Sequence, residues 1–203
     1  MSRGRLPVDD RAGREDAILD AALAQLIEDG PSGLSMLAVA QRAHASKETL
    51  YSWFGSKDGL ITALIERNAD RAMFAVDAGL ANDDIDPRRA LTDFSVGLLT
   101  LLTAPGSVAL NRAAMSSPEL AERLLASGRF RVGPVVERYL AGLHERQVIR
   151  APDPAESFEL LYGLVVRDLP IRVLLRDPTP APASFPRRAA VAVDQFLRLC
   201  EPG

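Results

Sequence analysis

The chain has 203 residues, 47% of them hydrophobic and 25% charged, which is ordinary for a globular protein with one large or two small domains. Its formal net charge of −3 argues against a protein that coats nucleic acid without sequence preference, since such proteins are basic overall. A single cysteine, Cys200, indicates a reducing compartment, and the lack of a secretory signal or of an apolar run of roughly 18 residues predicts a cytoplasmic protein without a membrane partner.

The chain begins with an arginine-rich segment that we predict to be a flexible basic arm over residues 1–14. Four arginines and two aspartates give this segment a net charge of +2. The arm could reach the minor groove or the phosphates of DNA, or it could be a solvated tail. The sequence leaves both alternatives open.

Three short helices are predicted next. Apolar residues recur every four positions from about residue 13 to 29, which indicates a helix that Gly30-Pro31 should end. Ser35 can then cap a second helix with its hydroxyl. His44-Ala45 forms a tight turn, and Ser46 can cap a third helix.

The third helix has an apolar side and a polar, aromatic side. Leu50 and Phe54 lie four residues apart and should point inward together. The side chains left for the outer face are Lys47, Glu48, Thr49, Tyr51, Ser52 and Trp53. Such a face on a two-turn helix favours a helix-turn-helix that contacts DNA. The alternative is a small three-helix packing unit in which Tyr51 and Trp53 are core residues.

The segment from about Glu15 to Leu64 resembles the DNA-binding domain of the TetR family of transcriptional regulators. The residues that match at the family's spacing are Gly33, Ser35, Val39-Ala40, Ala43, Ser46, Leu50-Tyr51, Phe54, Lys57 and Leu60. The resemblance implies an all-α protein. Its parts would be a helix-turn-helix DNA-binding domain at residues 15–62 and a larger helical ligand-binding and dimerisation domain at 63–203.

Three positions depart from the family's pattern. His44 stands where the family most often has glycine, so the turn would be held differently. Trp53 stands where histidine is common, and its ring can still pack on the sugar-phosphate backbone and donate one N–H. Leu37 replaces a polar side chain from which some members contact a base, so base recognition depends more on the third helix.

The resemblance also implies which residues contact DNA. Ser35, Tyr51 and Lys57 would mainly hold phosphates, whereas Lys47 and Thr49 are the best candidates for base edges. The full expected DNA-binding set is Ser35, Ser46, Lys47, Thr49, Tyr51, Trp53 and Lys57. From residue 33 to 60, three basic and two acidic residues give only +1, which suffices for a site-specific binder.

The rest of the chain also predicts helices, with no alternating pattern of a strand. A long helix should run from about Ser56 into the seventies, followed by a polar linker at 82–86. Three N-cap-and-proline pairs then mark helix starts, at Asp86-Pro87, Ser117-Pro118 and Asp153-Pro154. Pro170 falls inside an apolar run and should kink its helix. The prolines at 178, 180, 182 and 186 predict a stiff connector before a last helix at 187–199.

This second half resembles, more loosely, the C-terminal domain of the AefR-like subgroup of the same family. The similarity lies in the run PELAERLLASGRFR from Pro118, the stretch RYLAGLHERQVI from Arg138, and the start at Asp153-Pro154. It implies that two helices, at 154–176 and 187–199, pair with their copies as a four-helix bundle. The alternative is that these two helices only complete the core of one subunit.

A ligand cavity in the second domain is the further implication of the family. The candidate lining residues are Phe94, Leu98, Arg112, Met115, Tyr139 and Tyr162. Arg112 lies in an otherwise apolar stretch, where an unpaired buried guanidinium would be costly. It is therefore paired with an internal acid, exposed, or aimed at a ligand carboxylate.

The predicted function is that of a homodimeric transcriptional repressor that binds a palindromic operator and is released by a small-molecule effector. The alternatives are a helical protein-interaction module and a transcriptional activator of the same fold. An enzyme is not expected, because the sequence has no nucleophile elbow, phosphate-binding glycine motif or zinc-protease motif. With two histidines and one cysteine, neither a metal site nor a cofactor is expected.

Overall fold

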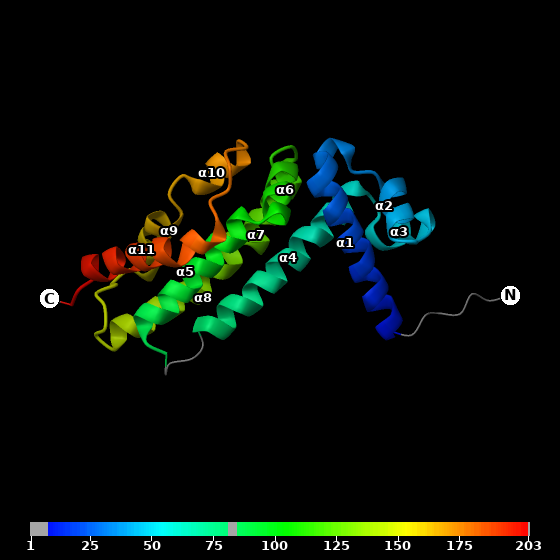
Figure 1. Cartoon of the computed structure of the whole chain (residues 1–203). Helices are drawn as coiled ribbons and strands as arrows, with labels where there is room; N and C mark the ends of the chain where they lie inside the picture. Colours follow the sequence, from blue (N-terminus) through cyan, green and yellow to red (C-terminus); the bar gives the residue numbers. More distant parts are fainter. Residues whose placement is uncertain (1–7, 81–84, 203) are drawn as a thin grey trace. The chain divides into compact units, whose positions relative to one another are not determined.

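The computed structural model of the chain describes residues 8–80 and 85–202, in which all regular secondary structure is helical (Figure 1). The predicted all-α fold is confirmed. The elements are α1 (Val8–Gly33), α2 (Met36–Arg42), α3 (Lys47–Phe54), α4 (Lys57–Leu80), α5 (Pro87–Thr103), α6 (Pro105–Ala114), α7 (Pro118–Ser127), α8 (Arg129–Glu145), α9 (Pro154–Val166), α10 (Leu169–Leu174), the 3-10 turn η1 (Pro182–Ser184) and α11 (Phe185–Leu199).

The helices form two compact units. The N-terminal unit comprises Met1–Arg67 together with Ala109–Leu124, and the C-terminal unit comprises Asn68–Val108 and Leu125–Gly203. Helix α4 contributes residues to both. This grouping differs from the expected division at residue 62, because the segment 109–124 belongs with the N-terminal helices.

Side chains from distant parts of the sequence build the core of the N-terminal unit. Ile18 of α1, Leu50 of α3 and Leu64 of α4 are at most 1% exposed and lie in one cluster. Leu110 of α6 and Leu120 of α7 join the same cluster. Each buried side chain of this size contributes about 1.5–3 kcal/mol relative to an exposed one. The core therefore depends on α6 and α7 as well as on the three helices predicted from the local pattern.

Helix α1 begins earlier than expected and contains the predicted stop. The helix starts at Val8, so Arg11 and Arg14 lie on a helix rather than on a flexible arm. Residues 1–7 lie outside the described residues. At Gly30 the backbone leaves the helical region, with φ 72° and ψ −178°, and a short turn continues from Pro31. The stop predicted at Gly30-Pro31 is therefore confirmed as a kink.

Arg67 links α4 to α1 within the N-terminal unit. Its Nη1 donates to the backbone oxygen of Asp16 at 3.2 Å and lies 2.8 Å from Oδ1 of Asp20. The Arg67 side chain is only 12% exposed, and its Nη2 is buried with no hydrogen-bond partner among the described residues. A buried guanidinium costs solvation free energy, so the link to α1 offsets part of that cost.

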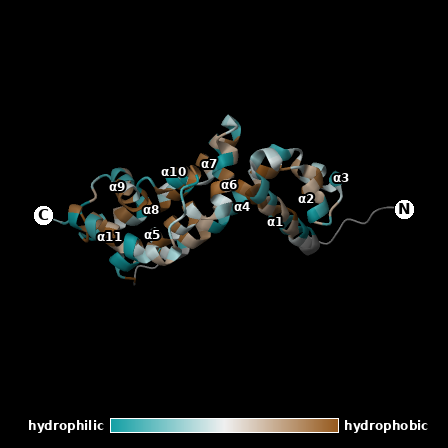
Figure 2. Ribbon diagram, turned by 45° about the horizontal axis from the view of Figure 1, so that its top comes forward, coloured by the Kyte–Doolittle hydropathy of each residue, from teal (hydrophilic) through white to brown (hydrophobic). Residues whose placement is uncertain are grey.

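The C-terminal unit is built around α5, α9 and α11, with α8 packed along α9 (Figure 2). Its core holds Leu91, Leu99, Val136, Leu161 and Phe196, each completely buried. The side chain of Arg188 on α11 donates from Nε and Nη2 to the backbone oxygens of Val165 and Val166, at 3.0 and 2.8 Å. These bonds satisfy carbonyls at the end of α9 that have no partner within that helix.

The three predicted helix starts are confirmed. The carboxylate of Asp86 accepts from the N–H of Arg89 at 3.1 Å, and the Ser117 hydroxyl accepts from the N–H of Leu120 at 3.3 Å. Asp153 Oδ1 accepts from two backbone N–H groups, each at 3.0 Å. Because a cap bonds only to residues two or three positions along the chain, its sequence pattern is local.

Two predictions based on proline were wrong. The apolar run that contains Pro170 is two helices rather than one kinked helix, because α9 ends at Val166 and Arg167 has a left-handed φ of 52°. Pro170 then lies in the first turn of α10, where its missing N–H needs no partner. Pro186 similarly lies in the first turn of α11 and is not part of the connector.

Within the described residues, no single helix is long and apolar enough to span a membrane. Among these residues, only the bent pair α5 and α6, taken together, has the length and the apolar composition of a membrane span.

Candidate nucleic-acid interface

The turn before α3 and the start of α3 have the geometry of a capped helix. The hydroxyl of Ser46 accepts from the N–H of Thr49 at 3.1 Å, and the two side-chain oxygens lie 3.0 Å apart. The predicted cap at Ser46 is therefore confirmed. Thr49 is half-buried, and its hydroxyl already has a partner in the free protein.

Helix α3 has a buried side and an exposed side. Leu50 is completely buried and Phe54 is half-buried against the same core. Lys47 is exposed and Tyr51 is 45% exposed, with the Lys47 ammonium 5.6 Å from the centre of the Tyr51 ring. A cation over a tyrosine ring is attracted by its π-face, so the two side chains form one polar-aromatic surface.

Trp53 is not simply a residue of the outer face. It is half-buried, packs against the core and meets the Phe54 ring edge-on, with centroids 6.4 Å apart. The guanidinium of Arg11 in α1 lies 5.3 Å from the centre of the Trp53 ring. The prediction of an outward-facing Trp53 was therefore only partly right, and the sequence gives no signal for its contact with Arg11.

The turn between α2 and α3 uses a backbone conformation that favours glycine. His44 has φ 49°, in the left-handed region where a side chain is strained. The family's usual glycine would adopt this conformation without strain. In this turn a histidine adopts a strained conformation that a glycine would adopt without strain.

Gly59 fixes the approach of α4 to the end of α3. A Cβ at this position would lie 1.9 Å from the backbone oxygen of Phe54, much closer than two non-bonded atoms can approach. Ser56 caps α4 by accepting from the N–H of Gly59 at 3.0 Å. The need for glycine here comes from a close approach of backbone, which the local pattern did not indicate.

Ser35 occupies the N-cap position of α2 and is exposed, but its hydroxyl makes no capping hydrogen bond. That prediction was wrong. Instead, the buried side chain of Gln25 in α1 accepts from the N–H of Ser35 at 3.5 Å and donates to the oxygen of Gly33 at 3.3 Å. The Ser35 hydroxyl is thereby left accessible.

Two basic residues near α3 are held by contacts within the unit. Lys57 Nζ donates to the backbone oxygen of Pro31 at 2.9 Å, so this side chain ties the start of α4 to the Gly30-Pro31 turn. Arg42 of α2 donates two hydrogen bonds to the carboxylate of Glu28, at 2.7 and 2.8 Å. These bonds lower the pKa of Glu28 below its ordinary value. Both contacts join segments that are far apart in sequence and were not predicted.

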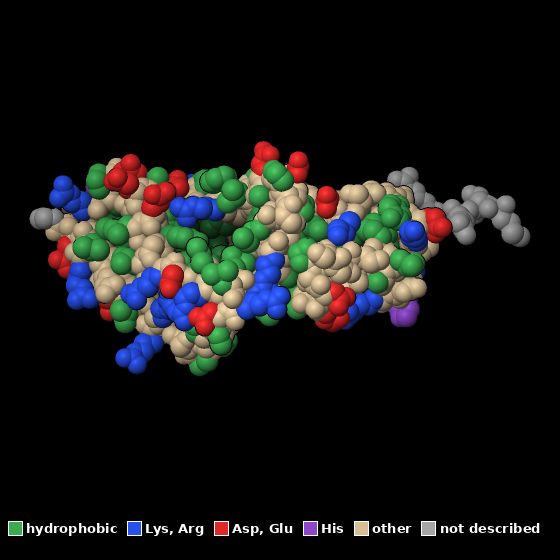
Figure 3. Space-filling model, turned by 90° about the horizontal axis from the view of Figure 1, so that it is seen from above, with side chains coloured by type: hydrophobic (Ala, Val, Ile, Leu, Met, Phe, Trp, Pro, Cys, Tyr) green, Lys and Arg blue, Asp and Glu red, His purple; other side chains and the backbone are tan. Residues whose placement is uncertain are grey.

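Charge is mixed over the surface rather than gathered in one field. Figure 3 shows Lys and Arg side chains interspersed with acidic and hydrophobic ones over the face in view. This distribution agrees with the net charge of −3 for the whole chain. A DNA contact on α3 would therefore depend on local groups, above all Lys47 and Tyr51.

The six candidate ligand residues are divided between the two units. Phe94 and Tyr139 are buried in the core of the C-terminal unit, where Leu98 and Tyr162 are partly buried. Arg112 is half-buried and Met115 is 76% exposed, and both belong to the N-terminal unit. That all six residues line a single cavity stays a prediction.

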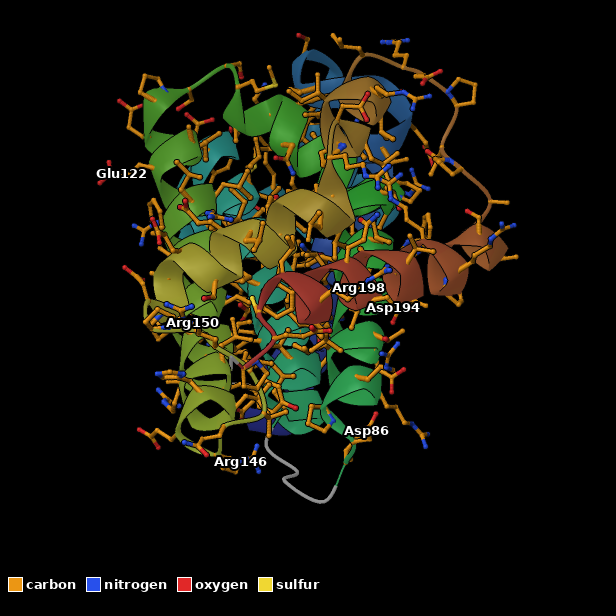
Figure 4. All side chains as sticks on the ribbon, turned by 90° about the vertical axis from the view of Figure 1, so that its left-hand side faces the viewer. Asp86, Glu122, Arg146, Arg150, Asp194 and Arg198 are labelled. Carbon is orange, nitrogen blue, oxygen red and sulfur yellow. The ribbon has the colours of Figure 1, made fainter. Side chains whose placement is uncertain are left out.

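A surface hollow of about 520 Å³ lies elsewhere in the C-terminal unit. Its wall includes Asp86 at the start of α5 and Asp194 and Arg198 on α11, which are labelled in Figure 4. None of the six candidate residues lines it. Among the described residues, no group of three or more His, Cys, Asp or Glu side chains could hold a metal ion.

Comparison with known families supports both halves of the chain. A family model described as "Bacterial regulatory proteins, tetR family" matches residues 18–64. A second, described as "AefR-like transcriptional repressor, C-terminal domain", matches residues 89–200. The HTH-type transcriptional repressor ComR of Escherichia coli is 30% identical over 122 residues, which cover 58% of this chain and 56% of ComR. The chain thus spans about half the length of this curated relative.

Solved structures cover more of the chain. A TetR transcriptional regulator from Agrobacterium tumefaciens is 32% identical, with a TM-score of 0.75 over 93% of this chain and 94% of that one. The flavonoid-responsive regulator FrrA is 27% identical, with a TM-score of 0.68 over 94% and 98% of the two chains. These similarities extend through both the helix-turn-helix and the C-terminal helices.

Proposed function

Because this chain belongs to the TetR family of transcriptional regulators, we propose that it acts in the cytoplasm as a homodimeric repressor of a palindromic operator, released by a small molecule. The family membership makes the chain a DNA-binding regulator and not an enzyme. The repression, the operator, the dimer and the ligand response are the parts that we propose.

The exposed side of α3 supports operator binding most directly. Lys47 and Tyr51 are exposed on a helix that the completely buried Leu50 anchors to the core. In a dimer, two such helices would enter successive major grooves, about 34–36 Å apart for one turn of DNA. Lys47 and Thr49 would contact base edges, for which Thr49 must exchange its bond with Ser46.

The phosphate contacts would come from residues around α3. Tyr51 offers a hydroxyl, and Ser35 has an accessible hydroxyl that is not used for capping. Lys57 has three donor hydrogens and uses one on Pro31, which leaves two for a phosphate oxygen. Its bond to Pro31 would also hold the ammonium in position before DNA binds.

The homodimer is supported by apolar side chains exposed on α9 and α11. Leu160 on α9 is 39% exposed, and Val191 and Leu199 on α11 are 47% and 66% exposed. Val191 and Leu199 lie eight residues apart and so share a side of their helix. Replacing Val191 with glutamate should shift the protein to monomer in analytical ultracentrifugation, whereas the same change at exposed Leu125 should not. A wild-type monomer at micromolar concentration would argue against the dimer.

Release by a small molecule is supported by the family and by the relative FrrA, which is a flavonoid-responsive regulator. A ligand can shift a protein away from DNA only if it binds the DNA-free form more tightly than the DNA-bound form. The ligand site would lie in the C-terminal unit, where Phe94, Tyr139 and Tyr162 contribute aromatic surface.

The direct test is to select bound duplexes from a random DNA pool at one stated salt concentration, since affinity for DNA depends strongly on salt. We expect enrichment of one palindromic motif. Enrichment of a motif without two-fold symmetry would contradict the dimeric arrangement. No enrichment above that of a Lys47→Ala, Tyr51→Ala double variant would contradict operator binding through α3.

Single substitutions then separate the two kinds of contact. Tyr51→Ala should weaken binding to the motif and to unrelated DNA alike, because a phosphate contact carries no sequence information. Lys47→Ala should in addition reduce the preference for the motif, by roughly tenfold if it contacts a base. Arg138→Ala, an exposed change on α8, is the matched control. An equal loss of preference in both α3 variants would contradict these roles.

A further inference from the structure

Arg129, at the start of α8, lies over two aromatic rings of α9. The centre of its guanidinium is 4.7 Å from the centre of the Tyr162 ring and 5.3 Å from that of Phe158. The two rings are one helical turn apart and meet edge-on, with centroids 6.2 Å apart. Phe158 is 4% exposed and belongs to the core, so it gives the cluster a fixed base.

Gly133 of α8 faces the Phe158 ring of α9. A Cβ at Gly133 would lie 3.6 Å from the Phe158 ring and 3.3 Å from a carboxylate oxygen of Glu137. The Phe158 ring therefore packs directly against the α8 backbone. This packing holds the Phe158 ring in place beneath the guanidinium of Arg129, which lies one helical turn before Gly133 on α8.

The guanidinium of Arg129 is only loosely paired. Its Nη2 lies 3.5 Å from an oxygen of Glu159, and the Glu159 side chain is 72% exposed. Two other arginines of the same unit have shorter ion pairs. Nη1 of Arg131 lies 2.5 Å from Oδ1 of Asp70, and Nη2 of Arg172 lies 2.5 Å from Oδ2 of Asp177. The Arg129 side chain is itself 34% exposed, so its donors can be reached from solvent.

Tyr162 places a second donor beside Arg129. Among residues 8–80 and 85–202, the hydroxyl has no hydrogen-bond partner. Burial raises the pKa of Tyr162, although the charge of Arg129 opposes the shift. The phenol is therefore protonated at neutral pH and able to donate. Val132 is half-buried one turn beyond Arg129 and adds apolar surface on the same side of α8.

We propose that Arg129 and Tyr162 form a binding site for the carboxylate of a small organic acid whose apolar body lies against α8 and α9. The guanidinium presents a planar pair of N–H groups that matches the two oxygens of a carboxylate. Contact with two rings restricts the guanidinium in advance, which reduces the entropy lost on binding. The ligand displaces Glu159, whose exposed carboxylate returns to water. The inference rests on the proposed ligand response and names the class of ligand.

The test uses the full-length protein with ¹⁵N-labelled arginine and no DNA. Benzoate, 1-naphthoate and decanoate are titrated while the Arg129 Nε–H signal is followed by NMR. Two comparison probes are titrated in the same way: benzamide, which lacks the negative charge, and inorganic phosphate, which lacks the apolar body. We expect saturable shifts of the Arg129 signal with at least one carboxylate and weaker binding of both comparison probes. No saturable shift with any of the three carboxylates, or equal binding of benzamide or phosphate, would overturn the proposal.

Variants separate binding from structural support. Arg129→Gln should lower the affinity for the carboxylate roughly tenfold or more, because a charge-assisted pair is lost. Tyr162→Phe should lower the same affinity several-fold. Glu159→Gln should strengthen binding, because it removes the competing carboxylate, a result that a purely structural Arg129 would not produce. Arg138→Gln on α8 should change nothing. Unchanged affinity in Arg129→Gln, measured by calorimetry on a protein with wild-type circular dichroism, contradicts the site.

Operator affinity is measured separately, so the two proposals can fail independently. A carboxylate that binds at Arg129 without changing operator affinity supports the site and contradicts release by this ligand class. Operator binding without any carboxylate binding leaves the DNA-binding function standing and overturns the site.

Discussion

The two units of this protein place their candidate functional residues in different ways. In the N-terminal unit, Lys47, Thr49 and Tyr51 lie within five consecutive residues of α3, and one buried residue, Leu50, sets the direction of all three. In the C-terminal unit, Arg129 and Tyr162 meet only because α8 packs against α9. A contact surface on one helix can be predicted from helical periodicity, whereas a site shared between helices depends on tertiary packing.

The largest expected effect comes from glycine. Gly59→Ala should destabilise the N-terminal unit by about 2 kcal/mol or more, because its Cβ would overlap the Phe54 oxygen and force α3 and α4 apart. Gly97→Ala in α5 meets nothing within 4 Å and should stabilise the C-terminal unit by up to about 1 kcal/mol. Hydrogen exchange resolved by peptide measures each unit separately. Equal effects in the two variants would contradict the close approach at Gly59.

Caps should have similar, intermediate effects in the two units. Ser46→Ala and Asp153→Ala each remove a side chain that accepts from backbone N–H groups, at a cost of about 1 kcal/mol. Only Ser46→Ala should also weaken operator binding, because it frees the start of α3. Urea unfolding and a DNA-binding titration of both variants check this. A loss of operator affinity in Asp153→Ala would indicate that the two units are energetically coupled.

Each unit also has a non-glycine residue with a left-handed backbone, His44 at φ 49° and Gln147 at φ 57°. Replacing either with glycine should stabilise the protein by up to about 1 kcal/mol, because relief of strain exceeds the extra entropy of the unfolded chain. The melting temperature of each variant is the measurement. A lower melting temperature for His44→Gly alone would mean that the histidine side chain makes a contribution that its φ angle does not reveal.

The smallest expected effect is the pH dependence of the Glu28–Arg42 pair. Because the hydrogen bonds from Arg42 lower the pKa of Glu28, the unfolded chain takes up this proton more readily than the folded one. The stabilisation is therefore present above the unfolded pKa of Glu28 and is lost as the pH falls through the folded pKa. Glu28→Gln should unfold at a lower urea concentration than wild type at pH 7, and the two midpoints should converge as the pH falls through the folded pKa of Glu28. A constant difference would contradict this origin.

Most features that depend on residues within one turn of each other were predicted, although the cap expected at Ser35 was not formed. The stop at Gly30-Pro31, the caps at Ser46, Asp86 and Asp153, and the inward side of α3 were all confirmed. Each of these features follows from bonds or contacts between residues at most four positions apart, so the local sequence contains the necessary information.

What only the tertiary structure decided lies between distant segments. The packing of residues 109–124 with the N-terminal helices, the bond from Lys57 to Pro31 and the stacking of Arg129 on Tyr162 each join residues more than 25 positions apart. The sequence by itself determined most of the helices and the caps at Ser46, Asp86, Ser117 and Asp153, because periodicity and capping act along the chain. It did not determine which helices pack together, because the hydrophobic effect is non-directional and stabilises any contact that buries apolar surface. Which contacts form therefore depends on the packing of all the helices.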